Sequence, residues 1–309
     1  MDPVIYVLDT FVFVGIFALL SLSLNLEYGL TGLGNFGKVA FFMAGAYTWT
    51  LLSRAGVPFL GCLAGAALMA GVLGGLVTFP ALRLREDYLA IVTLSFGEIM
   101  RLIVKAEKGL AGGVWGITVP SAFAGLAATP RLVAGANLLA VCATVALVFA
   151  FLQLLAHSPY GRVLRGIRED DVAAAAVGKN VVLYKAQVLV LGSAIAGVAG
   201  GLFAQYVRFI DPYMFLPTVT FFVWIMLIVG GPGNNWGALL GALVVELMNR
   251  GTRIAKDYLQ LAVDPNNMQF IMFGLLIILI LFYRPEGLLR EGPVKTAARG
   301  KVSRWLSSS

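Results

Sequence analysis

Three ionisable side chains stand inside long apolar stretches, and they are the first residues here that could do chemistry. Glu98 and Arg101 are three positions apart, so a helix would place both on one face. Glu246 lies in a separate apolar stretch. A charge at the middle of a bilayer costs about 2.5–3.5 kcal/mol, so each of these residues needs an oppositely charged partner or water.

These charges allow two interpretations. Either they line a path for a solute, or Arg101 neutralises Glu98 or Glu246 and holds helices together. We favour the second interpretation, because a strong fixed charge would trap a solute in transit. The candidates for lining a path are mostly milder polar side chains: Asn25, Thr31, Asn35, Thr93, Ser95, Glu98, Thr218 and Thr220.

The sequence has no arrangement typical of catalysis. His157 is the only histidine, so no histidine-based metal site can be built. Cys62 and Cys142 both lie in apolar runs, and we interpret them as packing residues. The stretch 173–180 reads A-x-x-x-x-G-K-N, without the first glycine and the hydroxyl of a phosphate-binding loop. We therefore expect no catalytic residue, metal or nucleotide on this chain.

The composition predicts a membrane protein. Apolar residues make up 59% of the 309 residues and charged residues 13%, against about 25% charged residues in soluble proteins. The mean hydropathy is +0.87. Only helices and closed barrels cross lipid, and the apolar runs are continuous rather than alternating, which excludes a barrel. We expect one all-α polytopic domain over 1–309, with about 8–10 transmembrane helices, some short or broken.

The expected spans follow from the apolar runs, and they are about 4–24, 33–53, 59–79, 87–104, 132–155, 184–206, 216–230, 236–250 and 268–283. The first span lacks a basic leader and a cleavage site, so we interpret it as a retained helix. Spans 216–230 and 236–250 are short and flank a Gly-Gly-Pro-Gly-Asn-Asn turn. They form either a re-entrant pair or two crossings.

The segment around Gly29, Gly32, Gly34 and Gly37, at the start of the second span, is also glycine-rich. Broken helices of this kind often mark the pathway of a transporter. Small residues also let helices pack closely in membranes, and both interpretations stay open.

Nine crossings would put the two termini on opposite sides of the membrane. If the hydrophilic segment 156–183 is cytoplasmic, the N-terminus is outside, and the basic tail 284–309 is inside. Fourteen Lys and Arg residues would then lie inside, Lys38 among them, against eight outside. This bias agrees with the excess of basic residues on cytoplasmic loops of membrane proteins.

The hydrophilic segment has helix signals of its own. Ser158-Pro159 is a typical helix start, and Gly178 is a typical stop. One helix between them would align Val163, Ile167, Ala174 and Val177, with Arg162, Arg165 and Arg168 on a neighbouring side. Such a helix could lie in a groove of a soluble partner. Alternatively, the segment is a solvated connector whose arginines set the topology.

Short motifs in a fixed order over most of the chain resemble the permease subunits of ABC importers for branched-chain amino acids, the LivM type more than the LivH type. They comprise Ser23-Leu24-Asn25-Leu26, Gly29-Leu30-Thr31-Gly32, Phe41-Phe42, Gly45-Ala46-Tyr47, Leu82-Arg83-Leu84-Arg85, Tyr88-Leu89-Ala90-Ile91, Phe96-Gly97-Glu98, Gly161-Arg162, Ile167-Arg168-Glu169-Asp170, Gly230-Gly231, Trp236-Gly237, Leu240-Gly241-Ala242 and Arg284-Pro285-Glu286-Gly287-Leu288.

The resemblance implies a cell-membrane permease that works with a second permease subunit, two ATPase subunits that hold ATP and Mg, and an external binding protein. Segment 156–183 would then be the cytoplasmic coupling loop. In such loops a Glu-Ala-Ala-x-x-x-Gly pattern contacts the ATPase. Here Val172 replaces the glutamate, and Asp171 is the nearest acid. The residues expected to dock are Gly161, Arg162, Arg165, Arg168, Glu169, Asp170, Asp171, Ala173, Ala174 and Gly178.

The expected cargo is a branched-chain or other hydrophobic amino acid, and no nucleic acid is expected as a partner. Urea, short amides and sugars are the alternatives within the same machinery. An ion-coupled secondary transporter would work without an ATPase, and an intramembrane enzyme would need a paired acid, metal ligand or nucleophile. Reversing the charges of Arg162, Arg165 and Arg168 together is expected to uncouple transport from hydrolysis.

Overall fold

The computed structural model describes residues 3–81, 86–123, 130–259 and 265–292. Its elements run in the order α1 (Pro3–Leu24), π-helix η1 (Asn25–Gly29), α2 (Lys38–Arg54), α3 (Phe59–Ala81), α4 (Glu86–Ala106), η2 (Gly113–Trp115), β1 (Ile117–Thr118), α5 (Pro130–His157), α6 (Pro159–Glu169), α7 (Asp171–Ala176), α8 (Val181–Val207), β2 (Phe209–Ile210), η4 (Pro212–Phe215), α9 (Pro217–Gly230), α10 (Asn235–Leu259) and α11 (Pro265–Tyr283).

Each expected span overlaps a helix, which confirms the all-α polytopic fold, but the helix of the second span begins at Lys38 and not at residue 33. Within the described ranges, four helical stretches are long and apolar enough to cross a membrane: Val4–Gly29, Phe59–Thr78, Pro130–His157 and Val181–Val207. The α9–α10 pair would add a fifth. The strands β1 and β2 form only a two-residue antiparallel pair, Ile117 opposite Ile210 and Thr118 opposite Phe209.

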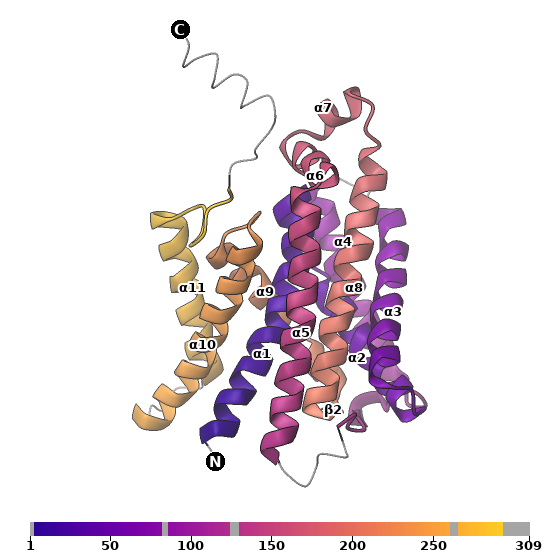
Figure 1. The fold of residues 1–309 in the computed structure, drawn as a ribbon, viewed down its shortest axis with the longest axis vertical. Coiled ribbons are helices and arrows are strands. Elements are labelled where there is room, and N and C mark those ends of the chain that lie inside the picture. Colours follow the sequence, from indigo (N-terminus) through magenta and orange to yellow (C-terminus); the bar gives the residue numbers. More distant parts are fainter. Residues whose placement is uncertain (1–2, 82–85, 124–129, 260–264, 293–309) are drawn as a thin grey trace.

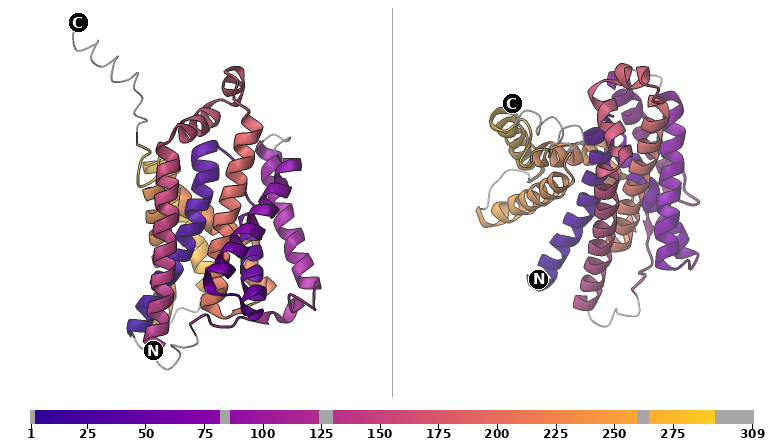
Figure 2. Two further views of the ribbon diagram at one scale, coloured as in Figure 1. Left: turned by 45° about the vertical axis from the view of Figure 1, so that its right-hand side comes forward. Right: turned by 45° about the horizontal axis from the view of Figure 1, so that its top comes forward.

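Successive long helices run up and down the molecule, so the N-terminus and the described end of the chain lie at opposite ends (Figure 1). Helices α2 and α3 pack against α8, and α1 packs against α5, α8 and α10. Helices α9, α10 and α11 form a group beside α1, while α6 and α7 project beyond the upper end of the bundle (Figures 1 and 2).

Glycine allows the closest of these contacts. A Cβ on Gly200 of α8 would overlap the backbone oxygen of Phe42 in α2. A Cβ on Gly45 of α2 would likewise overlap the backbone of Gly197 in α8. The two helix backbones therefore touch directly, as expected where small residues line a helix interface in a membrane.

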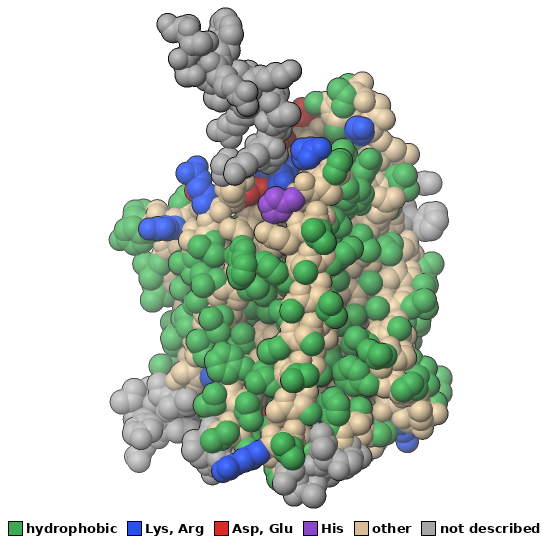
Figure 3. Space-filling view, in the orientation of Figure 1, with side chains coloured by type: hydrophobic (Ala, Val, Ile, Leu, Met, Phe, Trp, Pro, Cys, Tyr) green, Lys and Arg blue, Asp and Glu red, His purple; other side chains and the backbone are tan. Residues whose placement is uncertain are grey.

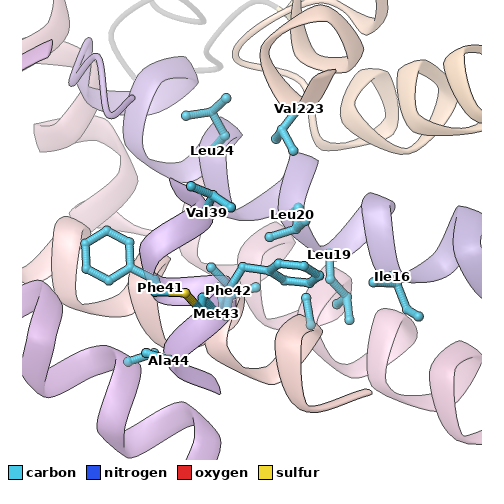
Figure 4. Packing of buried hydrophobic residues seen from close by; sticks show 14 of the residues in the cluster. Ile16, Leu19, Leu20, Leu24, Val39, Phe41, Phe42, Met43, Ala44 and Val223 are labelled. Atoms are coloured by element: carbon cyan, nitrogen blue, oxygen red, sulfur yellow. The ribbon is translucent and has the colours of Figure 1, made fainter. Parts of the chain in front are cut away.

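The core gathers side chains from most of the long helices, and α1, α2 and α9 meet in one part of it. Figure 4 shows Ile16, Leu19, Leu20 and Leu24 of α1 beside the Val39–Ala44 stretch of α2 and Val223 of α9. On the face shown in Figure 3, hydrophobic side chains cover the middle of the molecule, and Lys and Arg lie mainly toward its ends. Such an apolar belt fits a lipid environment, in which exposed hydrophobic side chains carry no cost.

The hydrophilic segment corrects one expectation, because it forms two helices instead of one. Asp170 has extended backbone angles (φ −159°, ψ 107°) and ends α6. Its carboxylate then accepts hydrogen bonds from the backbone N–H groups of Val172 and Ala173 at 2.8 and 3.0 Å, which starts α7. The alignment expected for one continuous helix is therefore lost: Ile167 and Ala174 are buried, but Val177 is exposed.

Both glycine-rich segments break the helices, which for residues 29–37 was one of the two interpretations left open. Residues 32–37 lie outside any helix, and Gly32 has a φ of +75°. Between α9 and α10 the chain turns by 119°, with Gly231 and Gly233 at φ +108° and +84°. Helix α10 also continues past the expected end at residue 250 to Leu259. The Leu82–Arg85 motif and the tail 293–309 lie outside the described residues.

Candidate functional site

A buried ion pair lies where the first two helices break. Glu27 belongs to the π-helix η1, and Lys38 is the first residue of α2. The Lys38 Nζ atom is 2.6 Å from Glu27 Oε1, and the two side chains are 1% and 0% exposed. Short π-helical segments inside longer helices are frequent at functional sites. Ionisable groups buried at membrane depth likewise mark functional sites by default.

Neighbouring polar groups complete this pair. Asn35 Nδ2 donates to Glu27 Oε2 at 3.0 Å, and Lys38 Nζ donates to Ser23 Oγ at 2.9 Å. Ser23 Oγ in turn donates to the backbone oxygen of Gly192 in α8 at 2.6 Å. Gly192 makes room for the carboxylate, because a Cβ there would overlap Glu27 Oε1. The two opposite charges thus stabilise each other without contact with solvent.

The structure brings five of the eight predicted path residues to this break, all of them buried: Asn25, Thr31, Asn35, Thr93 and Thr220. Thr93 Oγ1 accepts from the Phe36 N–H at 3.0 Å, and Thr220 Oγ1 accepts from the Val39 N–H at 3.1 Å. These side chains therefore fix the irregular backbone around residues 36–39. Ser95 and Thr218 are exposed elsewhere, and Glu98 is partly exposed.

The charges at 98, 101 and 246 have local partners. Arg101 donates two hydrogen bonds to Glu98, at 2.9 and 2.5 Å. Glu246 pairs with Arg250 on the same helix, with Arg250 Nε 3.1 Å from Glu246 Oε1. Of the two proposed partners of Arg101, Glu98 is the one it contacts. Arg101 therefore neutralises Glu98, but both residues lie on α4, so this pair does not join two helices as the structural interpretation expected.

The sequence analysis did not identify Glu27 as a candidate site residue, and it placed Lys38 in a loop on the inside of the membrane. Counting Lys38 among the inside loop charges was wrong, because its side chain is fully buried against Glu27. The sequence did contain a signal for this pair, because Glu27 and Lys38 are the only charged residues between Asp9 and Arg54. Opposite charges alone in an apolar stretch are expected to seek each other.

The outer surface of α7 carries apolar side chains, and polar residues precede and follow it in the chain. Val172 is 79% exposed and Val177 is 74% exposed. Behind them, Asp171 forms an ion pair with Lys185 of α8, which ties α7 to the bundle. Among the predicted docking residues, Arg162, Glu169, Asp170, Ala173 and Gly178 are exposed, Asp171 is half-buried, and Gly161 and Ala174 are buried.

Arg165 and Arg168 point inward. Arg165 Nε donates to Glu291 Oε1 at 2.7 Å, and Arg165 Nη1 donates to the backbone oxygen of Ala156 at 2.9 Å. Arg168 Nη2 donates to Glu291 Oε2 at 2.8 Å, and its Nη1 donates to the backbone oxygen of Gly29. Of the three arginines expected on the docking side, only Arg162 is fully exposed.

Comparison with known proteins gives the family. Residues 6–281 match the model of the branched-chain amino acid transport system / permease component family. This chain belongs to that family. It is 31% identical to the probable branched-chain amino acid transport permease protein LivM of Methanocaldococcus jannaschii, over 91% of this chain and 92% of the relative. It is 34% identical to the high-affinity LivM permease protein of Escherichia coli, over 89% and 68%.

This permease is less similar to LivH proteins. It is 25% identical to the high-affinity LivH permease protein of Escherichia coli, over 90% of this chain and 92% of the relative. The order of these identities agrees with the resemblance to the LivM type. No solved structure matches the chain.

Proposed function

We propose that this permease is one half of a permease pair in an ATP-driven importer of branched-chain or other hydrophobic amino acids. The second permease subunit would be of the LivH kind, since the family contains both. Two ATPase subunits would hold ATP and Mg, and an external binding protein would deliver the cargo. The observation that carries this proposal is the projecting α6–α7 loop with its exposed Val172 and Val177 (Figure 1).

The structure of the α6–α7 loop is more elaborate than a simple connection requires. A loop that only connects two spans needs neither two capped helices nor valines facing water. Apolar side chains exposed on an ordered helix outside the bundle are typical of a site that contacts another protein. At this end of the bundle, the loop would dock on the ATPases and move as they close on ATP. The subunit itself would be non-catalytic.

The buried polar cluster supports an uncharged passage. Glu27 and Lys38 neutralise each other, so the break presents no unpaired charge that would hold a zwitterionic amino acid. Specificity would then come mainly from the binding protein. Alternating access would open the space between the two permease subunits to each side in turn.

The docking surface can be tested by replacing Val172 and Val177 with serine together. We expect ATPase subunits to co-purify poorly with this variant, because the apolar contact is lost, while the helices stay folded. Leu139, a 73% exposed residue on α5, gives a control, and Leu139→Ser should leave the ATPases attached. Equal recovery of the ATPases with the double variant would contradict docking at α7. The two valines test docking more directly than the three arginines, because Arg165 and Arg168 point inward and bind Glu291.

The cargo can be tested in vesicles that hold the assembled transporter. ATP-dependent uptake of labelled leucine, competed by isoleucine and valine but not by urea, acetamide or glucose, is the expected result. Uptake driven by an ion gradient with nucleotide absent would show a secondary transporter and overturn the proposal.

A further inference from the structure

Three segments that are far apart in the sequence meet at one guanidinium group. Arg168 lies near the end of α6, the Gly29 carbonyl closes the π-helix η1, and Glu291 belongs to the segment after α11. Arg165, one turn earlier on α6, binds the other oxygen of the same carboxylate. Glu291 therefore holds α6 at two points, and Arg168 joins α6 to the broken first helix.

The Gly29 end of this connection is tightly packed. A Cβ on Gly29 would overlap Asn25 Oδ1 and lie 2.5 Å from the backbone nitrogen of Gly233. That nitrogen donates to Asn25 Oδ1 at 2.8 Å, so the π-helix is bound to the turn between α9 and α10. Glu27 is only two residues from Gly29 in the same π-helix. A displacement at Gly29 must therefore act on the Glu27–Lys38 pair or on the α9–α10 turn.

The Glu291 end is anchored to α9. The backbone N–H groups of Leu288 and Leu289 donate to the oxygens of Val229 and Gly230 at 2.9 and 3.0 Å. A Cβ on Gly233 would lie 2.7 Å from Glu291 Oε2 and 3.0 Å from Arg168 Nη1. The segment that carries Glu291 is thus tied to the bend at residues 231–234.

The space beside this contact leaves it free to rearrange. A cavity of about 570 Å³ is lined by Tyr28, Gly29, Gly32, Arg168, Pro232, Glu286, Arg290 and Glu291. The Arg165, Arg168 and Glu291 side chains are only 16%, 24% and 23% exposed, so water screens their attraction weakly. A strong contact with open space on one side can transmit a displacement and also break and re-form.

We propose that Arg168 and Glu291 are the positioning residues through which movement of α6 reaches the break in the first helix and the α9–α10 bend. Displacing α6 pulls the Gly29 carbonyl and the Glu291 carboxylate at once, and both broken helices move with it. This inference rests on the proposed function, because it presupposes an ATPase that moves α6.

The test uses the complete transporter in vesicles, with leucine uptake and ATP hydrolysis measured on the same sample. In Glu291→Gln, we expect hydrolysis to continue and leucine moved per ATP to fall roughly fivefold or more, the size of an ordinary coupling between sites. Arg168→Lys should act in the same direction, because one ammonium cannot reach Gly29 and Glu291 with the fork geometry of a guanidinium. Glu286→Gln is the matched control. Glu286 pairs with Arg290 at 2.7 Å in the same segment, but the two side chains are 53% and 78% exposed.

Each outcome decides between coupling and simple anchoring. An unchanged ratio of uptake to hydrolysis in both variants would overturn the inference. So would a proportional loss of both activities with a lower melting temperature, since that pattern belongs to a residue that only stabilises the fold. Failure of the proposed function looks different: wild-type vesicles would then take up no leucine with ATP.

Discussion

The Glu27–Lys38 pair shows how a single buried contact can decide the structure of a membrane helix. The carboxylate can stay in an apolar core only because Lys38 and Asn35 contact both of its oxygens. Its position depends in turn on the π-helix, which directs Glu27 toward α8, and on Gly192, which leaves room for it. The break at residues 32–37 is what lets Lys38 begin a new helix beside Glu27.

Removing one member of the pair should therefore cost more than removing both. We expect Glu27→Gln or Lys38→Met alone to destabilise the protein by about 3–5 kcal/mol, because each leaves an uncompensated buried charge. The double variant should recover most of that loss. Thermal unfolding in detergent measures the effect, with Glu98→Gln on the more exposed pair as a control. Strictly additive losses in the double variant would contradict a mutual pairing.

At the scale of elements, backbone contact between α2 and α8 holds the centre of the bundle. In lipid there is little hydrophobic drive to bring helices together, so close packing and interhelical hydrogen bonds must do so. Gly45, Gly197 and Gly200 supply the close packing, and Ser23, which binds the Gly192 carbonyl, supplies a hydrogen bond from α1 to α8.

A methyl group in this interface should separate the two helices. We expect Gly200→Ala to destabilise the protein by about 1–3 kcal/mol, the usual cost of overpacking. Gly135→Ala on α5 provides the control, because a Cβ there meets nothing within 4 Å. It should be neutral or slightly stabilising, since alanine favours helix over glycine. Equal melting temperatures for the two variants would show that α2 and α8 can move apart freely.

At the scale of the whole molecule, the α6–α7 loop and the segment that follows α11 lie at one end, and the N-terminus lies at the other (Figure 1). Because Lys38 is buried in the protein, one basic residue fewer lies in the cytoplasmic loops. These loops still carry more Lys and Arg residues than the loops on the outside. The orientation with the N-terminus outside remains a prediction from that excess.

Labelling of single cysteines in intact cells tests the orientation. After replacement of Cys62 and Cys142 by alanine, Val177→Cys should react only when the label can reach the cytoplasm. Trp115→Cys should react with an impermeant label from outside. Trp115 is 86% exposed and lies two residues before β1, which pairs with β2 at the end of the bundle opposite α7 (Figure 1). The reverse pattern would invert the topology and remove α7 from reach of any cytoplasmic ATPase.

Much of the fold could be predicted because lipid leaves the backbone few choices. An apolar run in a bilayer must satisfy its own hydrogen bonds, so hydropathy places helices such as α3 and α8, and the glycine-rich turn places the break at residues 231–234. Hydropathy also extended the second span to residue 33, into the break at residues 32–37. The helix ends were predicted less well. Asp170 divides the hydrophilic segment because its carboxylate caps α7. The sequence did not predict this cap, because an acidic residue in a polar stretch has many other possible roles.

What the sequence by itself determined is therefore local: helical spans, their breaks, the polar loop and the family. Only the tertiary structure decided which long side chains meet, because partner choice depends on where distant segments come together. The sequence pattern predicts Arg165 and Arg168 as surface charges along α6. In the structure they bind the carboxylate of Glu291, which is more than 120 residues away in the sequence. Glu27 and Lys38 pair for the same reason, since only the folded break brings their charges together inside a core that excludes water.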